Sequence, residues 1–107
     1  MARGILAGIL AHRVVHPASV FVYDVSRRAS ADFKKKFRVN IAADIQSIFQ
    51  KTDTVLLAVK PQNLSEALAG LHEEKRRTRA KLAITILAGV PRKKVRSFLP
   101  SKVNVVR

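Results

Sequence analysis

An unbroken apolar run that ends at a Lys–Pro step constrains the fold of this chain most. Residues 55–59 are all apolar, and Lys60 and Pro61 follow directly. The run is too short for a buried helix and rich in strand-forming residues, which indicates a strand covered on both faces, as in a parallel sheet. Pro61 has no N–H and disfavours helical geometry at Lys60, so the chain turns there. Ligands of open α/β sheets lie beyond the carboxyl ends of strands, so residues 58–62 form a candidate binding segment.

A second strand-like run, residues 81–87, is followed by Ala88, Gly89, Val90 and Pro91. Gly89 permits a turn or the close approach of a ligand. Pro91 suits the first turn of a helix, which we expect over residues 92–99. This segment therefore repeats the arrangement of a strand followed by a candidate site.

Helical and strand-like segments alternate along the chain, which predicts an α/β fold with a parallel sheet. We expect a single domain over residues 1–107, without repeats or linkers. The other helices are expected over residues 1–15, 27–37 (capped by Ser26), 44–50 and a segment that begins at Asn63 or Ser65 and fades into 73–79. Strands are expected over residues 20–23, 38–41, 54–59, from 82 onward and over 102–106.

The chain is strongly basic. It contains 21 Lys and Arg against 7 Asp and Glu, which gives a net charge of +14. Residues 34–38, 75–79 and 92–96 form basic clusters. A field of this sign attracts polyphosphates and nucleic acid, which keeps a basic module that binds nucleic acid or another polyanion as the alternative function. Solvated faces and helix ends are the simpler interpretation, and one Tyr with no Trp offers little surface for base stacking.

Other classes of site are disfavoured. The chain has no Cys, so it contains no disulfide framework. The apolar run at residues 5–10 is too short to span a membrane, and we expect a cytoplasmic protein. His12 and His16 are four residues apart, but Pro17 disfavours helical geometry at His16, so a helix end is favoured over a metal site. No acid–base constellation is visible.

Two motifs resemble a known family. D-x-V-x-L-A-V-K-P-Q over residues 53–62 and I-T-I-L-A-G-V over residues 84–90 are similar to the nucleotide-binding domain of pyrroline-5-carboxylate reductases, and the resemblance covers nearly the whole chain. It implies a partial Rossmann-type, doubly wound parallel sheet with the first strand absent. The chain begins like the family's first helix, so the glycine loop is expected to be missing, as is the family's C-terminal dimerisation domain.

The resemblance also implies a site for NADP or NAD. Asp24 follows the second strand of the family pattern, where a carboxylate binds the ribose 2′-OH of NAD. Ser26, Arg27 and Arg28 follow closely, where guanidinium groups pair with the 2′-phosphate of NADP, the cofactor that most of the family uses. The remaining residues implied along the cofactor are Met1, Ala58, Val59, Lys60, Pro61, Ala88 and Gly89.

Plainer roles compete with these assignments. Asp24 can be a turn residue, Ser26 a helix cap, the two arginines and Lys60 solvated side chains, and Gly89 a tight turn. Two positions also depart from the family pattern. Ile45 stands where the family often has Asn or Ser, and Arg38 stands where it often has Gly.

The family reaction is the reduction of pyrroline-5-carboxylate to proline with NAD(P)H, in proline biosynthesis. This chain alone is expected to be inactive, because it shows no acid–base set and the family's substrate site lies largely in the domain expected to be missing. A missing first strand would leave the strands at 20–23 and 54–59 with open edges. We therefore expect marginal stability, direct pairing of these two strands, or an oligomer formed through the edges.

Overall fold

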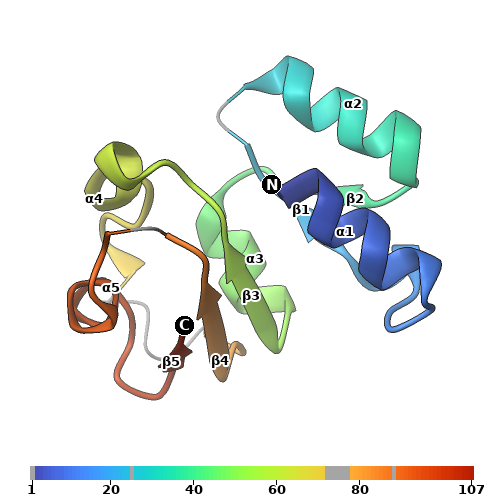
Figure 1. The fold of residues 1–107 in the computed structure, drawn as a ribbon. Helices are drawn as coiled ribbons and strands as arrows, with labels where there is room; N and C mark the ends of the chain where they lie inside the picture. Colours follow the sequence, from blue (N-terminus) through green and yellow to red (C-terminus); the bar gives the residue numbers. More distant parts are fainter. Residues whose placement is uncertain (1, 25, 72–77, 88) are drawn as a thin grey trace. The chain divides into compact units, whose positions relative to one another are not determined.

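The computed structural model describes residues 2–24, 26–71, 78–87 and 89–107. Its contacts divide the chain into two compact units, Met1–Asp44 and Ile45–Arg107, each of which carries its own parallel sheet. Figure 1 shows the elements of both units in chain order. The fold is therefore mixed α/β, as the sequence predicts, whereas a single domain over 1–107 stays a prediction.

The first unit consists of two helices and a short parallel sheet. Its elements are α1 (Ala2–Ala11), a 3₁₀ turn (Pro17–Ser19), β1 (Phe21–Val22), α2 (Arg27–Phe37) and β2 (Asn40–Ile41). β1 and β2 are parallel, with Phe21 opposite Asn40. The Asn40 side chain also donates from Nδ2 to the carbonyls of Ala18 and Val20, at 2.8 and 3.2 Å. Among the described residues, one small buried cluster of this unit consists of Leu6, Phe33 and Val39.

The second unit holds a three-stranded parallel sheet in the order β3-β4-β5. Its elements are α3 (Ile45–Lys51), β3 (Thr54–Leu57), a 3₁₀ turn (Pro61–Asn63), α4 (Leu64–Ala67), β4 (Leu82–Thr85), α5 (Arg92–Phe98) and β5 (Asn104–Val106). Thr54 pairs with Leu82 and Leu57 with Thr85, and β4 pairs in turn with β5. β4 is therefore hydrogen-bonded along both of its edges.

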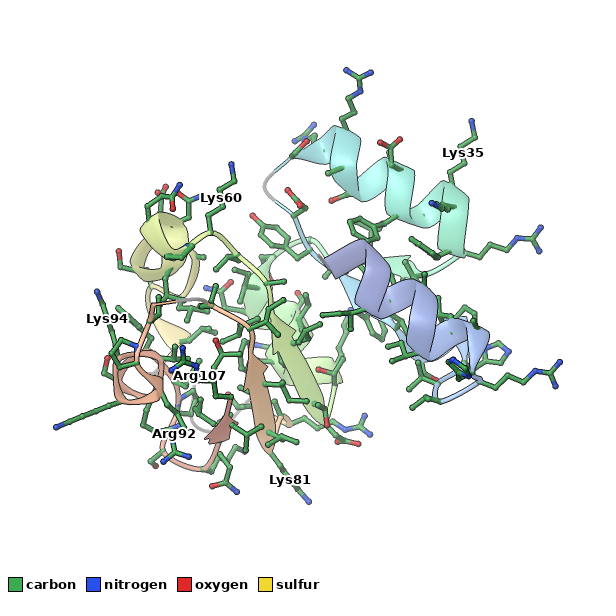
Figure 2. The ribbon with its side chains drawn as sticks, in the orientation of Figure 1. Lys35, Lys60, Lys81, Arg92, Lys94 and Arg107 are labelled. Atoms are coloured by element: carbon green, nitrogen blue, oxygen red, sulfur yellow. The ribbon has the colours of Figure 1, made fainter. Side chains whose placement is uncertain are left out.

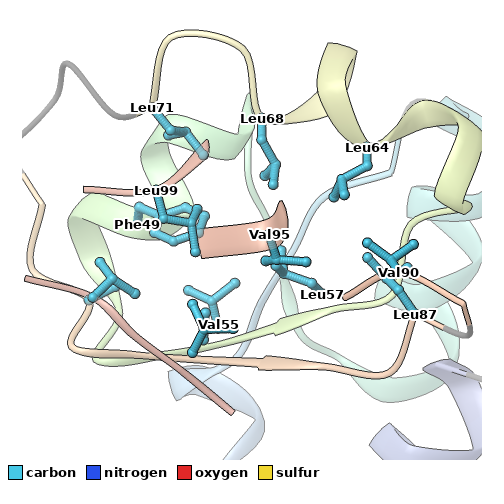
Figure 3. Packing of buried hydrophobic residues seen from close by; sticks show 14 residues of the cluster. Phe49, Val55, Leu57, Leu64, Leu68, Leu71, Leu87, Val90, Val95 and Leu99 are labelled. Carbon is cyan, nitrogen blue, oxygen red and sulfur yellow. The ribbon is translucent and has the colours of Figure 1, made fainter. Parts of the chain in front are cut away.

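The core of the second unit is extensive. Phe49 of α3, Leu64 and Leu68 from the α4 region, and Val95 of α5 are almost fully buried. Figure 3 shows these side chains gathered over the sheet together with Val55 and Leu57 of β3. Successive strand side chains point to opposite faces, so Leu56 is 38% exposed between two buried neighbours. Within this unit β3 is thus covered on one face, and cover on both faces stays a prediction.

Several predicted boundaries change where the backbone turns. The first helix ends at Ala11 instead of residue 15, and Arg13 adopts a left-handed φ of 56°. α4 ends at Ala67, shortly before Gly70 with a φ of 81°, so the long helix predicted after Asn63 is one turn. Its predicted extension overlaps residues 72–77, which lie outside the described residues. The last strand starts at Asn104 instead of residue 102.

The strand pairings bear on the predicted sheet order. β1 pairs with β2 and β3 pairs with β4, so β1 and β3 belong to different sheets. Direct pairing is one of the three outcomes expected from open strand edges, and the described strands do not show it. The observed pairs are those that the Rossmann order places on either side of its first strand.

Candidate functional site

In the second unit, two candidate segments leave the sheet at the same edge. β3 and β4 are adjacent and parallel, with Leu57 opposite Thr85. The N–H of Ile86 donates to the carbonyl of Leu57 at 3.4 Å, which continues the pairing one residue further. The residues that follow β3 and those that follow β4 therefore start side by side at the carboxyl edge, where α/β proteins bind ligands.

The β3 segment turns sharply at Lys60 and Pro61. Lys60 is extended, with φ −68° and ψ 141°, and precedes the 3₁₀ turn. Its carbonyl accepts the N–H of Asn63 at 2.9 Å. The Lys60 side chain is exposed and points away from the turn in Figure 2. Ala58 and Pro61 are also exposed, whereas Val59 is half-buried and packs against the large core. The segment thus presents one cation on a turn that is anchored by Val59.

The β4 segment is anchored by a buried hydroxyl. Thr85 is 1% exposed, and its Oγ1 accepts the N–H of Leu87 at 3.2 Å. Gly89 follows with a φ of 75°, and a Cβ built on it would meet nothing within 4 Å. Glycine adopts this φ without strain, and the space beside its Cα is open. Gly89 is exposed and leaves this side of the turn open to solvent, while Ala88 lies outside the described residues.

In the first unit, Asp24 and Ser26 form a turn that starts α2. Asp24 Oδ1 accepts the N–H of Ser26 at 2.9 Å. Ser26 Oγ accepts the N–H of Ala29 at 3.2 Å, so Ser26 is the N-cap, as predicted. The following Arg27 and Arg28 are exposed. Turn, cap and two arginines therefore lie together, close to the carboxyl end of β1.

Ser30 completes this arrangement and was not singled out from the sequence. It is 6% exposed, and its Oγ donates to the carbonyl of Asp24 at 3.4 Å. A small polar residue one turn after the cap, on the same side of α2 as Phe33, is the signal that could have indicated it. Asp24 is thus tied to α2 through both its side chain and its carbonyl.

These groups can recognise two different chemical features. A carboxylate only accepts hydrogen bonds and suits a ribose hydroxyl, while guanidinium groups donate and suit phosphate. The Ser26 hydroxyl accepts from Ala29 and keeps its own proton for donation. A helix N-terminus is also favourable for an anion. Three of these features favour phosphate, and the Asp24 charge opposes it.

The two departures from the family pattern have structural roles. Arg38 adopts a left-handed φ of 58° and ends α2, with its N–H donating to the carbonyl of Lys34 at 2.9 Å. That φ is the one glycine adopts most easily, which accounts for glycine as the expected residue. Ile45 is half-buried and packs against the large core. Met1 lies outside the described residues.

The structure gives His16 a role in a turn. His16 Nδ1 accepts the N–H of Ala18 at 3.1 Å and caps the 3₁₀ turn. Among the residues that the structure describes, no cluster of three metal-ligating side chains occurs. No helix within the described ranges is long and apolar enough to cross a membrane.

Parallel strands joined by helices, with candidate segments at their carboxyl ends, define a Rossmann-like α/β protein. The chain belongs to the family described as NADP oxidoreductase, coenzyme F420-dependent, whose profile matches residues 1–89. Its homologues are pyrroline-5-carboxylate reductases. The resemblance read from the motifs at residues 53–62 and 84–90 is thereby confirmed.

Individual relatives align along the whole chain. The chain is 33% identical to the pyrroline-5-carboxylate reductase of Methanosarcina acetivorans, over 100% of this chain and 39% of the relative. It is 32% identical to the enzyme of Synechocystis sp., over 94% of this chain and 36% of the relative. The chain therefore spans about two fifths of the length of the curated relatives it matches.

Solved structures agree with the fold. The pyrroline-5-carboxylate reductase from Coxiella burnetii superposes with a TM-score of 0.82 at 27% identity, over 97% of this chain and 38% of that one. The Plasmodium falciparum enzyme, solved with NADP bound, superposes with a TM-score of 0.71 at 20% identity, over 95% of this chain and 36% of that one. The second likeness shows the fold alone.

Proposed function

We propose that this chain binds the dinucleotide of a pyrroline-5-carboxylate reductase and prefers NADP(H) to NAD(H). One observation carries the proposal. The candidate segments follow the carboxyl ends of parallel strands in both units, which is where Rossmann-like sheets bind dinucleotides. The relative from Plasmodium falciparum was solved with NADP bound, which supports the same cofactor.

The start of α2 would hold the adenosine 2′-phosphate. Arg27 and Arg28 would pair with its oxygens, and the Ser26 hydroxyl would donate to it while still capping the helix. Asp24 would act mainly on the turn itself, since its carboxylate already accepts the N–H of Ser26 and its carbonyl accepts Ser30. The arginines would therefore provide the selectivity for NADP(H), and Asp24 would hold the turn in its conformation.

By resemblance to the family, the carboxyl edge of the second unit's sheet is also a proposed contact of the dinucleotide. Lys60 would supply a positive charge beside it, and the open space at Gly89 would admit the nicotinamide ring. The bound cofactor would supply a hydride, and the proposed substrate is pyrroline-5-carboxylate, which this reduction converts to proline. Val59 and Thr85 would keep the two segments in place through the packing and hydrogen bond described above.

Calorimetric titration with NADP⁺ and NAD⁺ tests the cofactor proposal. We expect NADP⁺ to bind about tenfold more tightly, because two guanidinium groups face one phosphate, and this preference should shrink with added salt. The double change Arg27→Ala and Arg28→Ala should remove the preference. The matched control, Lys34→Ala with Lys35→Ala, removes the same charge from the other end of α2 and should preserve it.

Equal affinity for both dinucleotides would contradict the proposed preference. Loss of the preference on changing Asp24→Ala alone would show that the selective residue has been misassigned. The substrate proposal is tested separately by replacing the matching segment of the Methanosarcina acetivorans reductase with this chain. Retained NADPH oxidation with pyrroline-5-carboxylate, lost on changing Gly89→Val, is the expected result. A chimera that folds and binds NADPH but stays inactive would count against the substrate.

A further inference from the structure

A basic depression lies between α5 and β5, outside the proposed cofactor segments. Its volume is about 650 Å³, and its lining residues are Arg92, Lys93, Arg96, Ser101, Val103, Asn104 and Val105. Four of these are exposed and polar: Arg92, Lys93, Ser101 and Asn104. We call these four residues the α5–β5 basic face. Figure 2 shows Arg92 and Lys94 projecting from this part of the unit.

Arg96 has a structural role in this face, because its guanidinium group is hydrogen-bonded to the backbone. The Arg96 side chain is half-buried, and its guanidinium donates to the carbonyls of Leu99, Pro100 and Val103. These bonds hold the loop between α5 and β5 against the helix. Ser101 and Asn104 are thereby kept beside Arg92 and Lys93.

Three of the four cations of α5 lie at the end of the helix where they do not stabilise it, and Arg96 in the last turn is the exception. Arg92, Lys93 and Lys94 occupy the first turn, which contains no acidic residue. The macrodipole is positive at that end and disfavours cations there. The sequence from residue 75 to residue 107 has no Asp or Glu at all. This stretch therefore contains no carboxylate that could compensate the charge of the α5–β5 basic face.

We propose that the α5–β5 basic face binds the phosphodiester backbone of nucleic acid without sequence preference. Arg and Lys contact phosphates, and Ser and Asn side chains add hydrogen-bond donors of the kind that position proteins on a backbone. Phe98, the aromatic residue of α5, packs against the large core, so it is not presented for base stacking. Backbone contact without stacking predicts binding that depends on salt and not on sequence.

A membrane surface fits this face less well. Interfacial binding requires apolar side chains that enter the headgroup region. Among the described residues, the large exposed apolar side chains are Val14, Val15, Ile41, Leu56 and Val106. Of these, Val106 alone belongs to α5 or β5. A basic face with few exposed apolar side chains favours binding to a soluble polyanion over binding to a membrane surface.

Fluorescence anisotropy with a short fluorescein-labelled RNA duplex of mixed sequence tests this proposal on the full chain. The double change Arg92→Gln and Lys93→Gln should weaken binding about tenfold at low salt. It should also reduce the magnitude of the slope of log K against log [salt] by about 2. The control, Lys34→Gln with Lys35→Gln, removes two exposed cations from the last turn of α2 and should change affinity less than about twofold. Both variants should keep the wild-type circular dichroism and NADP⁺ affinity.

If the two double changes weaken RNA binding equally, the loss depends only on net charge and the proposal is overturned. Unchanged binding by the α5 pair would do the same. Asn104→Asp places a negative charge on the face at an exposed strand position, and it should also weaken binding. This variant decides the matter if the α5 pair fails to fold. Polyglutamate or anionic vesicles that compete as well as RNA, at equal charge concentration, would show that the partner is not nucleic acid.

Discussion

The two units bury very different amounts of apolar surface. Ile45–Arg107 packs residues from three helices and its sheet into one extensive core. In Met1–Asp44, the buried cluster of the described residues is Leu6, Phe33 and Val39, with half-buried neighbours. The proposed NADP-selective residues Ser26, Arg27 and Arg28 stand in the unit with the smaller core. Their geometry therefore depends more on caps and turns than on packing, whereas the Lys60 and Gly89 segments rest on a well-packed sheet.

A matched pair of phenylalanines tests this contrast with the largest expected effect. Phe49 is 1% exposed in the large core and Phe33 is 8% exposed in the small one. Phe49→Ala should lower the free energy of unfolding by about 3–5 kcal/mol, because it removes a large side chain and leaves a cavity. Phe33→Ala should cost less, since its less enclosed site can collapse or admit water. Urea unfolding followed by circular dichroism measures both, and a larger loss for Phe33→Ala would reverse the comparison.

Amide hydrogen exchange sharpens the contrast without any substitution. β4 is paired along both edges inside the large core, whereas β1 and β2 form a two-stranded sheet. Opening of the smaller unit should require less free energy by about 1.4 kcal/mol or more, which makes exchange at Asn40 and Ala42 about tenfold faster than in β4. Both of these amides donate across the small sheet. Equal protection in the two sheets would mean that the units unfold together.

The cap of α2 should contribute a measurable part of the first unit's stability. Ser26→Ala removes the acceptor for the Ala29 N–H and should cost about 1 kcal/mol. Ser97→Ala serves as the control, because the Ser97 hydroxyl donates to the Lys94 carbonyl at an exposed position of α5, and it should change stability by less than about 0.5 kcal/mol. Thermal unfolding of both variants provides the measurement. A negligible cost for Ser26→Ala would show that the turn at Asp24 persists without the cap.

Charge reversal at the two lysine clusters should produce the smallest effects, and they should have opposite signs. Lys35 lies in the last turn of α2, where a cation interacts favourably with the dipole, and Lys93 lies in the first turn of α5, where it does not. Lys35→Glu should destabilise the chain by about 0.3–1 kcal/mol, and Lys93→Glu should stabilise it by a similar amount at low salt. Urea unfolding at low and high salt checks both, and effects of the same sign would contradict the dipole argument.

Much of the local structure could be predicted because its causes lie within a few residues. α2 has the predicted bounds, with Ser26 as its cap, since the cap and the helix it starts are adjacent in sequence. β3 starts at Thr54 and β4 at Leu82 as expected, because short apolar runs bounded by polar residues favour strands. The parallel arrangement followed from the alternation of these elements.

The candidate site was predicted less completely. The turn at Lys60 agrees with the expectation from Pro61, and the positive φ of Gly89 agrees with the expected turn. Cofactor contact by these two residues stays a prediction. The hydrogen bonds from Ser30 to the Asp24 carbonyl and from the Leu87 N–H to Thr85 Oγ1 were not predicted. Both depend on which face of an element meets a neighbour, and a list of neighbouring residues does not contain that information.

The sequence by itself determined the fold class, the family and most of the element types, because propensity, caps and apolar runs act locally. Tertiary structure alone decided that Leu56 stays exposed and that Arg96 binds three carbonyls. It also decided that Ser101 and Asn104 line a depression with Arg92. The physical reason is that burial and side-chain hydrogen bonds are set by the packing of elements that are distant in sequence. Residues 34–36 lie at the end of a helix and residues 92–94 lie at the start of one, beside a depression, because the packing around the two basic runs differs.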